Sequence, residues 1–175
     1  NTIWTSGYGG INQINLILEE IPKLDLSPAV TQAEKDRWEG QLYFLRGLMM
    51  FDMAKVYAYI PGAVVTAQDR GGIPIILTSI SSVDSALSFR PSRSPIDDVY
   101  TQIVSDLTAA NTRLLSSASV NLANKIAAQG LLARVNLYRK NYSEAKRWAD
   151  SCITLGGSKM TTVSNYVNSW RVDTH

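Results

Sequence analysis

Histidine and cysteine, on which many catalytic and metal sites depend, each occur only once in this chain of 175 residues. The single histidine, His175, is the last residue, so a Ser–His–Asp triad or a histidine-rich metal site has no raw material. The single cysteine, Cys152, allows no disulfide within the chain and leaves the redox compartment open. Neither a P-loop nor a full dinucleotide-binding glycine pattern occurs. The sequence therefore predicts no catalytic residues, no metal and no cofactor.

Long apolar runs and an excess of charge are also absent. No uncharged apolar run approaches the ~18 residues of a membrane span, and no basic segment followed by an apolar one opens the sequence. The 17 basic and 15 acidic residues are spread along the chain, and their net charge of +2 gives no sign of a nucleic-acid surface. Hydrophobic residues make up 45% of the chain, an ordinary value for a globular protein.

Small residues at helical spacing are the most informative feature that is present. They lie between Gly130 and Gly157, and they let two helices cross closely: Ala133, Ala145, Ala149 and Cys152. Tyr142 follows a short polar turn and is expected to pack back across it, while Gly156 and Gly157 are expected to end the second helix in a left-handed cap. The pattern predicts a tetratricopeptide-type hairpin over residues 124–155, with Cys152 as a buried structural thiol.

Upstream of this hairpin, apolar residues recur at the helical period in several segments. The predicted fold is a single all-α domain over residues 1–175, with tetratricopeptide-like hairpins and one long loop insertion. Its parts are a leading helix at 9–21, a hairpin of helices 31–60 and 95–115 with residues 62–93 inserted between them, the 124–155 hairpin, and an irregular tail at 161–175. Within the insertion, only residues 73–77 have the composition of a short extended piece.

The boundaries and buried faces of the two long helices can also be predicted. Residues 31–34 form a capping-box sequence, and Ser94 is the expected N-cap of the later helix. The helix at 31–60 is expected to bury Trp38, Leu42, Leu45, Met49, Met53, Val56 and Ile60. The helix at 95–115 is expected to bury Val99, Ile103, Leu107, Ala110 and Leu114. Because an unpaired cation is costly in an apolar helix, Arg46 is expected to pair with an acid such as Asp106 on the facing helix.

Several short strings follow one another along the chain: Tyr8 to Asn15 (YGGINQIN), Phe44 to Gly47 with Phe51, Gly71 to Pro74, Val99-Tyr100 with Ile103 and Asp106-Leu107, Lys125 to Ala128, and Leu131 to Tyr138 with the Asn141-Tyr142 turn. Taken in this order, they resemble the SusD/RagB family of glycan-binding outer-membrane lipoproteins. Each string is weak alone, but the ordered set is specific and covers nearly the whole chain.

The resemblance implies a helical, non-catalytic protein at the cell surface. Such proteins are tethered to the outer membrane by a lipidated cysteine, capture oligosaccharides or polysaccharides without cleaving them, and deliver them to a SusC-like, TonB-dependent transporter. The chain as given departs from the family by lacking the signal peptide, the lipid-bearing cysteine and the long C-terminal half. Cys152 is mid-helix and cannot be lipidated, so a membrane anchor is expected only outside this chain.

Sugar recognition needs flat aromatic faces for C–H stacking and planar polar groups for hydroxyls. Trp4, Tyr8 and Asn12 are the best local candidates for such a site, and the alternative is that Trp4 or Tyr8 covers the hydrophobic core. Tyr166 and Trp170 in the irregular tail are a second candidate pair, with packing onto the bundle as the alternative.

Rival functions remain open. A tetratricopeptide-like adaptor that binds a peptide or protein groove would also use helical hairpins, although ordinary repeat adaptors have short turns. An acid-based glycosidase would need two carboxylates across a cleft. The pairs Asp97-Asp98 and Glu19-Glu20 have no such partners that the sequence can place. We therefore expect glycan capture by a protein that is not an enzyme.

Overall fold

The computed structural model describes residues 2–63, 66–116, 121–157 and 162–166. Within these ranges all regular elements are helical, and only an isolated bridge pairs Ser27 with Val30. The α-helices are α1 (Thr2–Glu20), α2 (Gln32–Tyr57), α3 (Val83–Ser88), α4 (Ile96–Arg113), α5 (Lys125–Tyr138) and α6 (Tyr142–Gly156). Short 3-10 turns are η1 (Ile21–Lys23), η2 (Thr66–Gln68) and η4 (Val163–Asn165). The all-α prediction is confirmed.

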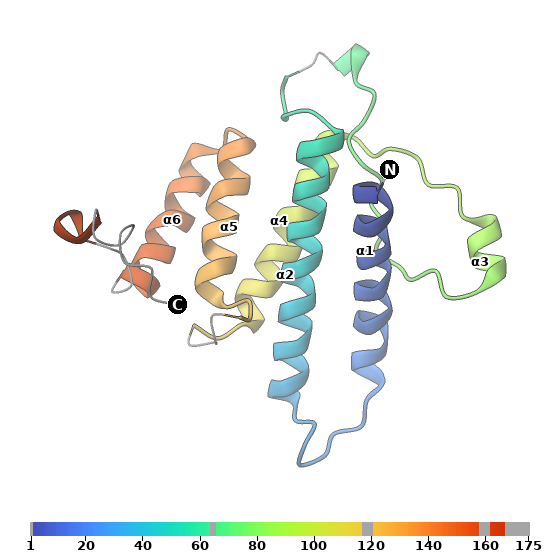
Figure 1. Cartoon of the computed structure of the whole chain (residues 1–175), viewed down its shortest axis with the longest axis horizontal. Helices are drawn as coiled ribbons and strands as arrows, with labels where there is room; N and C mark the ends of the chain where they lie inside the picture. Colours follow the sequence, from blue (N-terminus) through green and yellow to red (C-terminus); the bar gives the residue numbers. More distant parts are fainter. Residues whose placement is uncertain (1, 64–65, 117–120, 158–161, 167–175) are drawn as a thin grey trace.

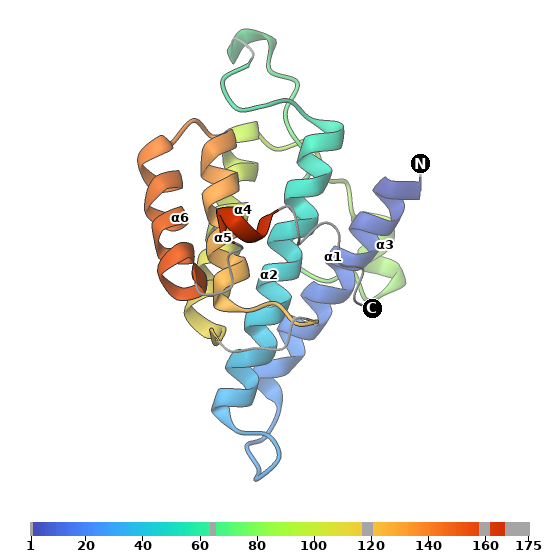
Figure 2. The same cartoon turned by 60° about the vertical axis from the view of Figure 1, so that its left-hand side comes forward.

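The long helices stand side by side as antiparallel neighbours (Figures 1 and 2). α1 packs on α2, α2 on α4, α4 on α5, and α5 on α6. α3 stands apart, on the far side of α1 from α5 and α6 (Figure 1). The chain thus forms a row of helical hairpins with one insertion at its α1 end.

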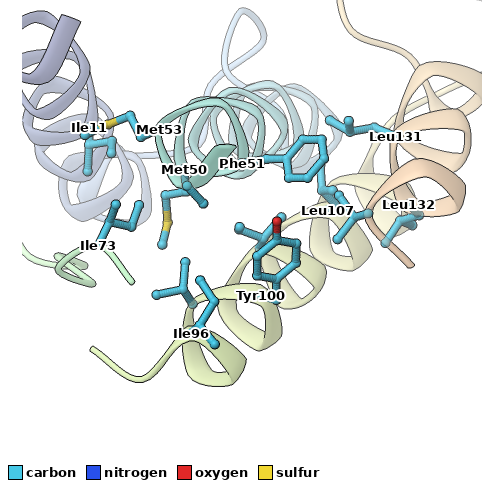
Figure 3. Packing of buried hydrophobic residues seen from close by; sticks show 14 of the residues in the cluster. Ile11, Met50, Phe51, Met53, Ile73, Ile96, Tyr100, Leu107, Leu131 and Leu132 are labelled. Atoms are coloured by element: carbon cyan, nitrogen blue, oxygen red, sulfur yellow. The ribbon is translucent and has the colours of Figure 1, made fainter. Parts of the chain in front are cut away.

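Figure 3 shows the apolar core between these helices. α2 contributes Met50, Phe51 and Ala54, which meet the α4 and α5 side chains in one cluster of buried residues. The whole predicted stripe of α4 is buried: Val99, Ile103, Leu107, Ala110 and Leu114 are each at most 2% exposed. Removing these apolar surfaces from water is the main force that holds the hairpins together.

The predicted buried face of α2 was wrong in part. Leu45 and Val56 are 43% and 57% exposed, and Ile60 lies beyond the end of the helix. Met53 is buried as predicted and Met49 is half-buried, and both face α1, where Gly7 and Gly10 leave room for them. α2 has helices on more than one side, so its apolar residues surround the helix and their period does not single out one face.

The first helix begins at Thr2 rather than at residue 9. Glycines at positions 7, 9 and 10 lower helix propensity, which is why the sequence suggested a later start. A Cβ at Gly7 or Gly10 would collide with Met53 or Met49, so these two glycines let α1 approach α2 closely. Trp4 and Tyr8 therefore lie inside the helix, not ahead of it.

The predicted helix starts hold in part. The Thr31 hydroxyl caps α2 by accepting from the Glu34 backbone N–H at 3.2 Å, whereas the Glu34 carboxylate pairs with Arg37 rather than completing the capping box. Ser94 is not the cap of α4, because Pro95 occupies that position. Its hydroxyl instead accepts from the Ile75 N–H at 3.3 Å, which ties the inserted segment to the start of α4.

The 124–155 hairpin is present as α5 and α6, with Ala133 and Ala149 half-buried and Ala145 buried. Cys152 is half-buried rather than buried as predicted, and its thiol donates to the Ile126 carbonyl at 3.5 Å, which links the two helices of the hairpin. The prediction for Tyr142 was wrong, since its side chain is 65% exposed.

Two backbone details explain why Tyr142 and the end of α6 differ from the prediction. The turn closes through Lys140 in the left-handed region (φ 59°), and the side chain of Asn141 then caps α6, so Tyr142 starts the helix facing outward. Tyr138 is the aromatic that packs inward, with its ring 5.1 Å from that of Phe51. The left-handed cap expected at the end of α6 is also wrong, because Gly157 has φ −59° and continues the right-handed turn.

The insertion at 62–93 is not a structureless loop. Residues 73–77 form no strand, but an extended segment at 71–80, here called the strap, runs along α1. The six-residue helix α3 follows, capped by reciprocal bonds between Ser82 and Ser85, and the sequence analysis missed it. Its serine-rich sequence has little apolar period to reveal it.

Gly71 sets the direction of the strap, and we predict that Gly71→Ala destabilises the fold. Its φ is +78°, and a Cβ there would lie 2.8 Å from the Cβ of Arg93. The expected loss is about 1–3 kcal/mol in the free energy of unfolding, measured by urea denaturation. Gly9→Ala is the matched control: its Cβ would meet nothing within 4 Å, and it should stabilise α1 by about 1 kcal/mol. Equal effects of the two variants would contradict the assignment.

Candidate functional site

A polar stripe on α1 holds the strap in place. Tyr8, Asn12, Asn15 and Glu19 follow the i, i+4, i+7, i+11 pattern of one helix face. All four bond to the strap, and most of the bonds go to its backbone: Tyr8 Oη donates to the Pro74 carbonyl at 2.8 Å, and Asn15 Nδ2 donates to the Ile76 and Thr78 carbonyls at 3.0 and 3.2 Å. The strap therefore lies along α1 without a sheet partner to satisfy its backbone groups.

The other two side chains of the stripe bind where the strap turns. Asn12 Oδ1 accepts from the Ile80 N–H at 2.7 Å, and its Nδ2 donates to the Ile80 carbonyl at 3.3 Å. Glu19 accepts from the Ser79 N–H at 2.7 Å and from the Ser79 hydroxyl at 2.6 Å. These hydrogen bonds hold the pKa of the Glu19 carboxyl below its usual value.

Asn15 links the strap to a buried ion pair. Its side chain is fully buried, and its Oδ1 accepts from Arg46 Nη1 at 2.8 Å. Arg46 in turn forms a two-pronged pair with Asp106, through Nε to Oδ2 at 2.8 Å and Nη2 to Oδ1 at 2.7 Å. The Arg46–Asp106 pairing predicted from the sequence is confirmed.

The surroundings of the pair satisfy its remaining groups. Gln102 Nε2 donates to Asp106 Oδ1 at 3.0 Å, and the guanidinium lies 5.4 Å from the centre of the Tyr43 ring. Gly47 lets α2 approach α4, since a Cβ added at this position would lie 3.0 Å from Leu107 side-chain atoms. Such additional partners offset the cost of burying an ion pair.

A cleft of about 220 Å³ opens between α1 and the inserted segment. Its α1 wall holds three of the predicted site residues, Trp4, Tyr8 and Asn12, so the structure brings them together. The opposite wall was missed by sequence analysis, because its residues lie in a segment without a helical or strand period: Pro74, Ile76, Ile80, Phe89 and Pro91.

Ring faces, rather than free hydrogen-bonding groups, dominate this cleft. The half-buried Trp4 ring lies 4.8 Å from the Tyr8 ring and 5.0 Å from the Tyr57 ring, centroid to centroid. Burial raises the pKa of the Tyr8 phenol, so it remains a protonated donor to the strap. Since the amide oxygen and the amide nitrogen of Asn12 both bond to the Ile80 backbone, the cleft offers mainly apolar surface to a ligand.

The tail candidates do not join this cleft. Tyr166 directly follows η4, is 58% exposed and is not one of the lining residues. Trp170 lies outside the described residues.

Two further observations bear on the class of site. In the described ranges, no group of three or more His, Cys, Asp or Glu side chains is arranged to hold a metal ion. None of the described helices is long and apolar enough to cross a membrane.

The fold and the cleft define a helical-hairpin scaffold protein with an aromatic-lined cleft. A family model for SusD-like proteins, described as starch-binding and associating with the outer membrane, matches residues 1–137. The chain belongs to this SusD-like family.

Solved structures of this family share the fold. A proposed sugar-binding protein from Bacteroides vulgatus is 28% identical over 99% of this chain, with a TM-score of 0.79. A SusD superfamily protein from Bacteroides thetaiotaomicron is 26% identical over 93% of the chain, with a TM-score of 0.77. A laminarin-binding SusD-like protein, at 20% identity over 99% of the chain and a TM-score of 0.76, supports the fold alone.

The chain spans 38%, 34% and 35% of the lengths of these proteins, respectively. A search of curated proteins finds no match.

We predict that breaking the buried ion pair is costly. Arg46→Leu leaves the Asp106 carboxylate, which is 2% exposed, without its countercharge. The free energy of unfolding should fall by about 3–5 kcal/mol in urea denaturation. The double variant Arg46→Leu/Asp106→Leu should recover much of this loss, because no unpaired charge remains. A double variant no more stable than the single one would contradict this account of the pair.

The bond from Ser79 predicts a pH effect at Glu19. Its folded-state pKa is depressed, so its contribution to stability is present above the unfolded-state pKa, about 4.3, and is lost as the pH falls through the folded value. Ser79→Ala removes the hydroxyl donor and should move the Glu19 pKa upward, as measured by carboxyl NMR titration. Ser81→Ala, at an exposed neighbouring position, is the control and should leave that titration unchanged.

Proposed function

We propose that the protein captures oligosaccharides or polysaccharides at the outer surface of the outer membrane without cleaving them. Membership of the SusD-like family supports both the ligand class and the location. In this proposal the parent protein carries a lipid anchor outside this chain and passes its glycan to a SusC-like, TonB-dependent transporter. The helical hairpins form the scaffold of the complex.

The observation that carries the proposal is the cleft between α1 and the inserted segment. Trp4 places an aromatic face beside the rings of Tyr8 and Tyr57, and Phe89 adds another ring from the opposite wall. The C–H face of a pyranose stacks on such rings, while its hydroxyls point outward to water. The inserted segment is therefore a functional wall rather than a connecting loop.

The cleft also favours a neutral sugar. None of its described lining residues carries a charge, so an acidic sugar would lose hydration on entry without gaining a partner. Neutral polymers such as glucans, mannans and xylans are the first ligands to test.

Affinity electrophoresis tests the proposal directly. The chain is run through native gels that contain α-glucan, β-glucan, fructan, mannan, xylan or mucin glycans, with a helical non-binding protein as reference. We expect retardation in at least one neutral glycan gel. Retardation in none of them would contradict glycan capture by this chain, and capture of a peptide ligand instead would favour the helical adaptor.

Substitutions at the cleft locate the site. Trp4→Ala and Phe89→Ala remove rings from opposite walls, and each should weaken retention about three- to tenfold, the effect of a lost stacking contact. Tyr142→Ala is the matched control, because it removes an exposed aromatic ring from α6 and should change nothing. Circular dichroism checks the fold. A cooperative loss of helicity in Trp4→Ala would show that Trp4 is a core residue, and unchanged retention in the folded Phe89→Ala variant would place the site elsewhere.

A further inference from the structure

A second cleft lies where α2 ends against α4 and α5. It has a volume of about 200 Å³ and is lined by Lys55, Ala58, Tyr59, Ile60, Tyr100 and Tyr138. Pockets for drug-sized ligands begin at roughly 300 Å³, so this space suits a molecule of a single ring. We call it the tyrosine cleft, because its three tyrosines come from separate parts of the chain: the segment after α2, helix α4 and helix α5. Among the described residues, it shares no lining residue with the cleft between α1 and the inserted segment, which we call the Trp4 cleft.

The hydroxyl of Tyr59 lacks a hydrogen-bond partner. The atom is buried, and no described residue bonds to it. Native structures rarely leave a buried hydroxyl unpaired, because its hydration is lost without compensation. Tyr59 lines the tyrosine cleft, so a small turn of its side chain would bring the hydroxyl to a molecule in the cleft, which would supply the missing partner.

Tyr100 brings a second phenol to the same cleft. Its side chain is only 1% exposed, and its ring meets the Phe51 ring edge-on at 6.1 Å. Figure 3 shows Tyr100 extending from α4 toward α2, with the hydroxyl at its tip. Burial, and to a lesser degree Tyr138, raises the pKa of Tyr100 to about 12, so its hydroxyl stays protonated at physiological pH.

The charge balance of the tyrosine cleft favours a neutral ligand. Lys55 is the one charged residue in the described lining, and its ammonium already pairs with Asp52 at 2.6 Å while lying 4.7 Å from the Phe51 ring centre. A charged ligand would give up hydration and find no free countercharge. Phenols both donate and accept, and their ring faces are apolar, which matches a ring that carries hydroxyl groups.

We propose that the tyrosine cleft binds one neutral hydroxylated ring, such as a single sugar residue, through the hydroxyls of Tyr59 and Tyr100. The choice of a sugar as this ring rests on the proposed function. The cleft itself does not depend on the Trp4 site, so the chain has two separate places for sugar rings.

NMR titration of the ¹⁵N-labelled chain tests the site. D-Glucose, D-galactose, D-mannose and N-acetyl-D-glucosamine are added one at a time. At least one should shift the backbone amides of residues 58–60. Tyr59→Phe and Tyr100→Phe delete only a hydroxyl, and each should lower the affinity for that sugar about three- to tenfold, as expected for one lost hydrogen bond. Tyr142→Phe, at an exposed position outside the cleft, should leave binding unchanged. If no sugar shifts these amides, the proposal is overturned.

The stability of the sugar-free protein gives an independent readout. Because the Tyr59 hydroxyl is buried without a partner, Tyr59→Phe should keep or raise the melting temperature. A clear fall would show that the hydroxyl bonds within the protein, which would overturn the proposal.

A comparison with Trp4→Ala separates the two sites. That variant should lose polysaccharide retention and keep the monosaccharide shifts at residues 58–60. If wild-type retention fails while those shifts persist, the proposed function of the Trp4 cleft is wrong and the tyrosine cleft stands. The opposite result overturns the tyrosine cleft alone.

Discussion

A buried guanidinium must be fully paired, and the architecture of this protein depends on how Arg46 meets that requirement. Asp106 supplies the countercharge across the α2–α4 contact, and Asn15 supplies an acceptor from α1. One side chain thereby fixes the relative positions of three helices. Since Asn15 also donates to the strap, the same network sets the inserted segment against α1. Losing any member would leave a buried polar group unpaired, so the members of the network depend on one another.

The candidate binding surface follows from this network. An extended segment outside a sheet must find partners for its backbone groups, and the polar stripe of α1 provides them. As a result, the polar atoms of Tyr8 and Asn12 bond to the strap, and ring faces and prolines are left to line the cleft. A neutral, aromatic-lined cleft suits the capture of sugars, in keeping with the functional proposal for this member of the SusD-like family.

Local patterns in the sequence predicted the parts of this structure that depend on nearby residues. The stripe of α4, the 124–155 hairpin and the Arg46–Asp106 pair all follow from helical period or from the cost of an isolated charge. Residues 73–77 of the strap were expected to be extended, but its position along α1 was not predicted, because its bonds join residues far apart in sequence, such as Tyr8 and Pro74, and backbone carbonyls have no sequence signature. Tyr142 was misplaced for a similar reason, since the left-handed Lys140 that turns it outward is not a glycine. The strings at 8–15, 44–47, 71–74 and 106–107, weak when taken singly, prove to meet at one network.

If sugar rings stack on Trp4 in the cleft that the strap completes, a bound oligosaccharide must perturb both walls of that cleft. This is tested by titrating the ¹⁵N-labelled chain with an oligosaccharide of the glycan it retains, following the indole N–H of Trp4 and the amides of the opposite wall. We expect saturable shifts of the Trp4 indole and of the Phe89 amide with a single dissociation constant. Saturable shifts confined to other parts of the chain, with the Trp4 indole unmoved, would contradict it.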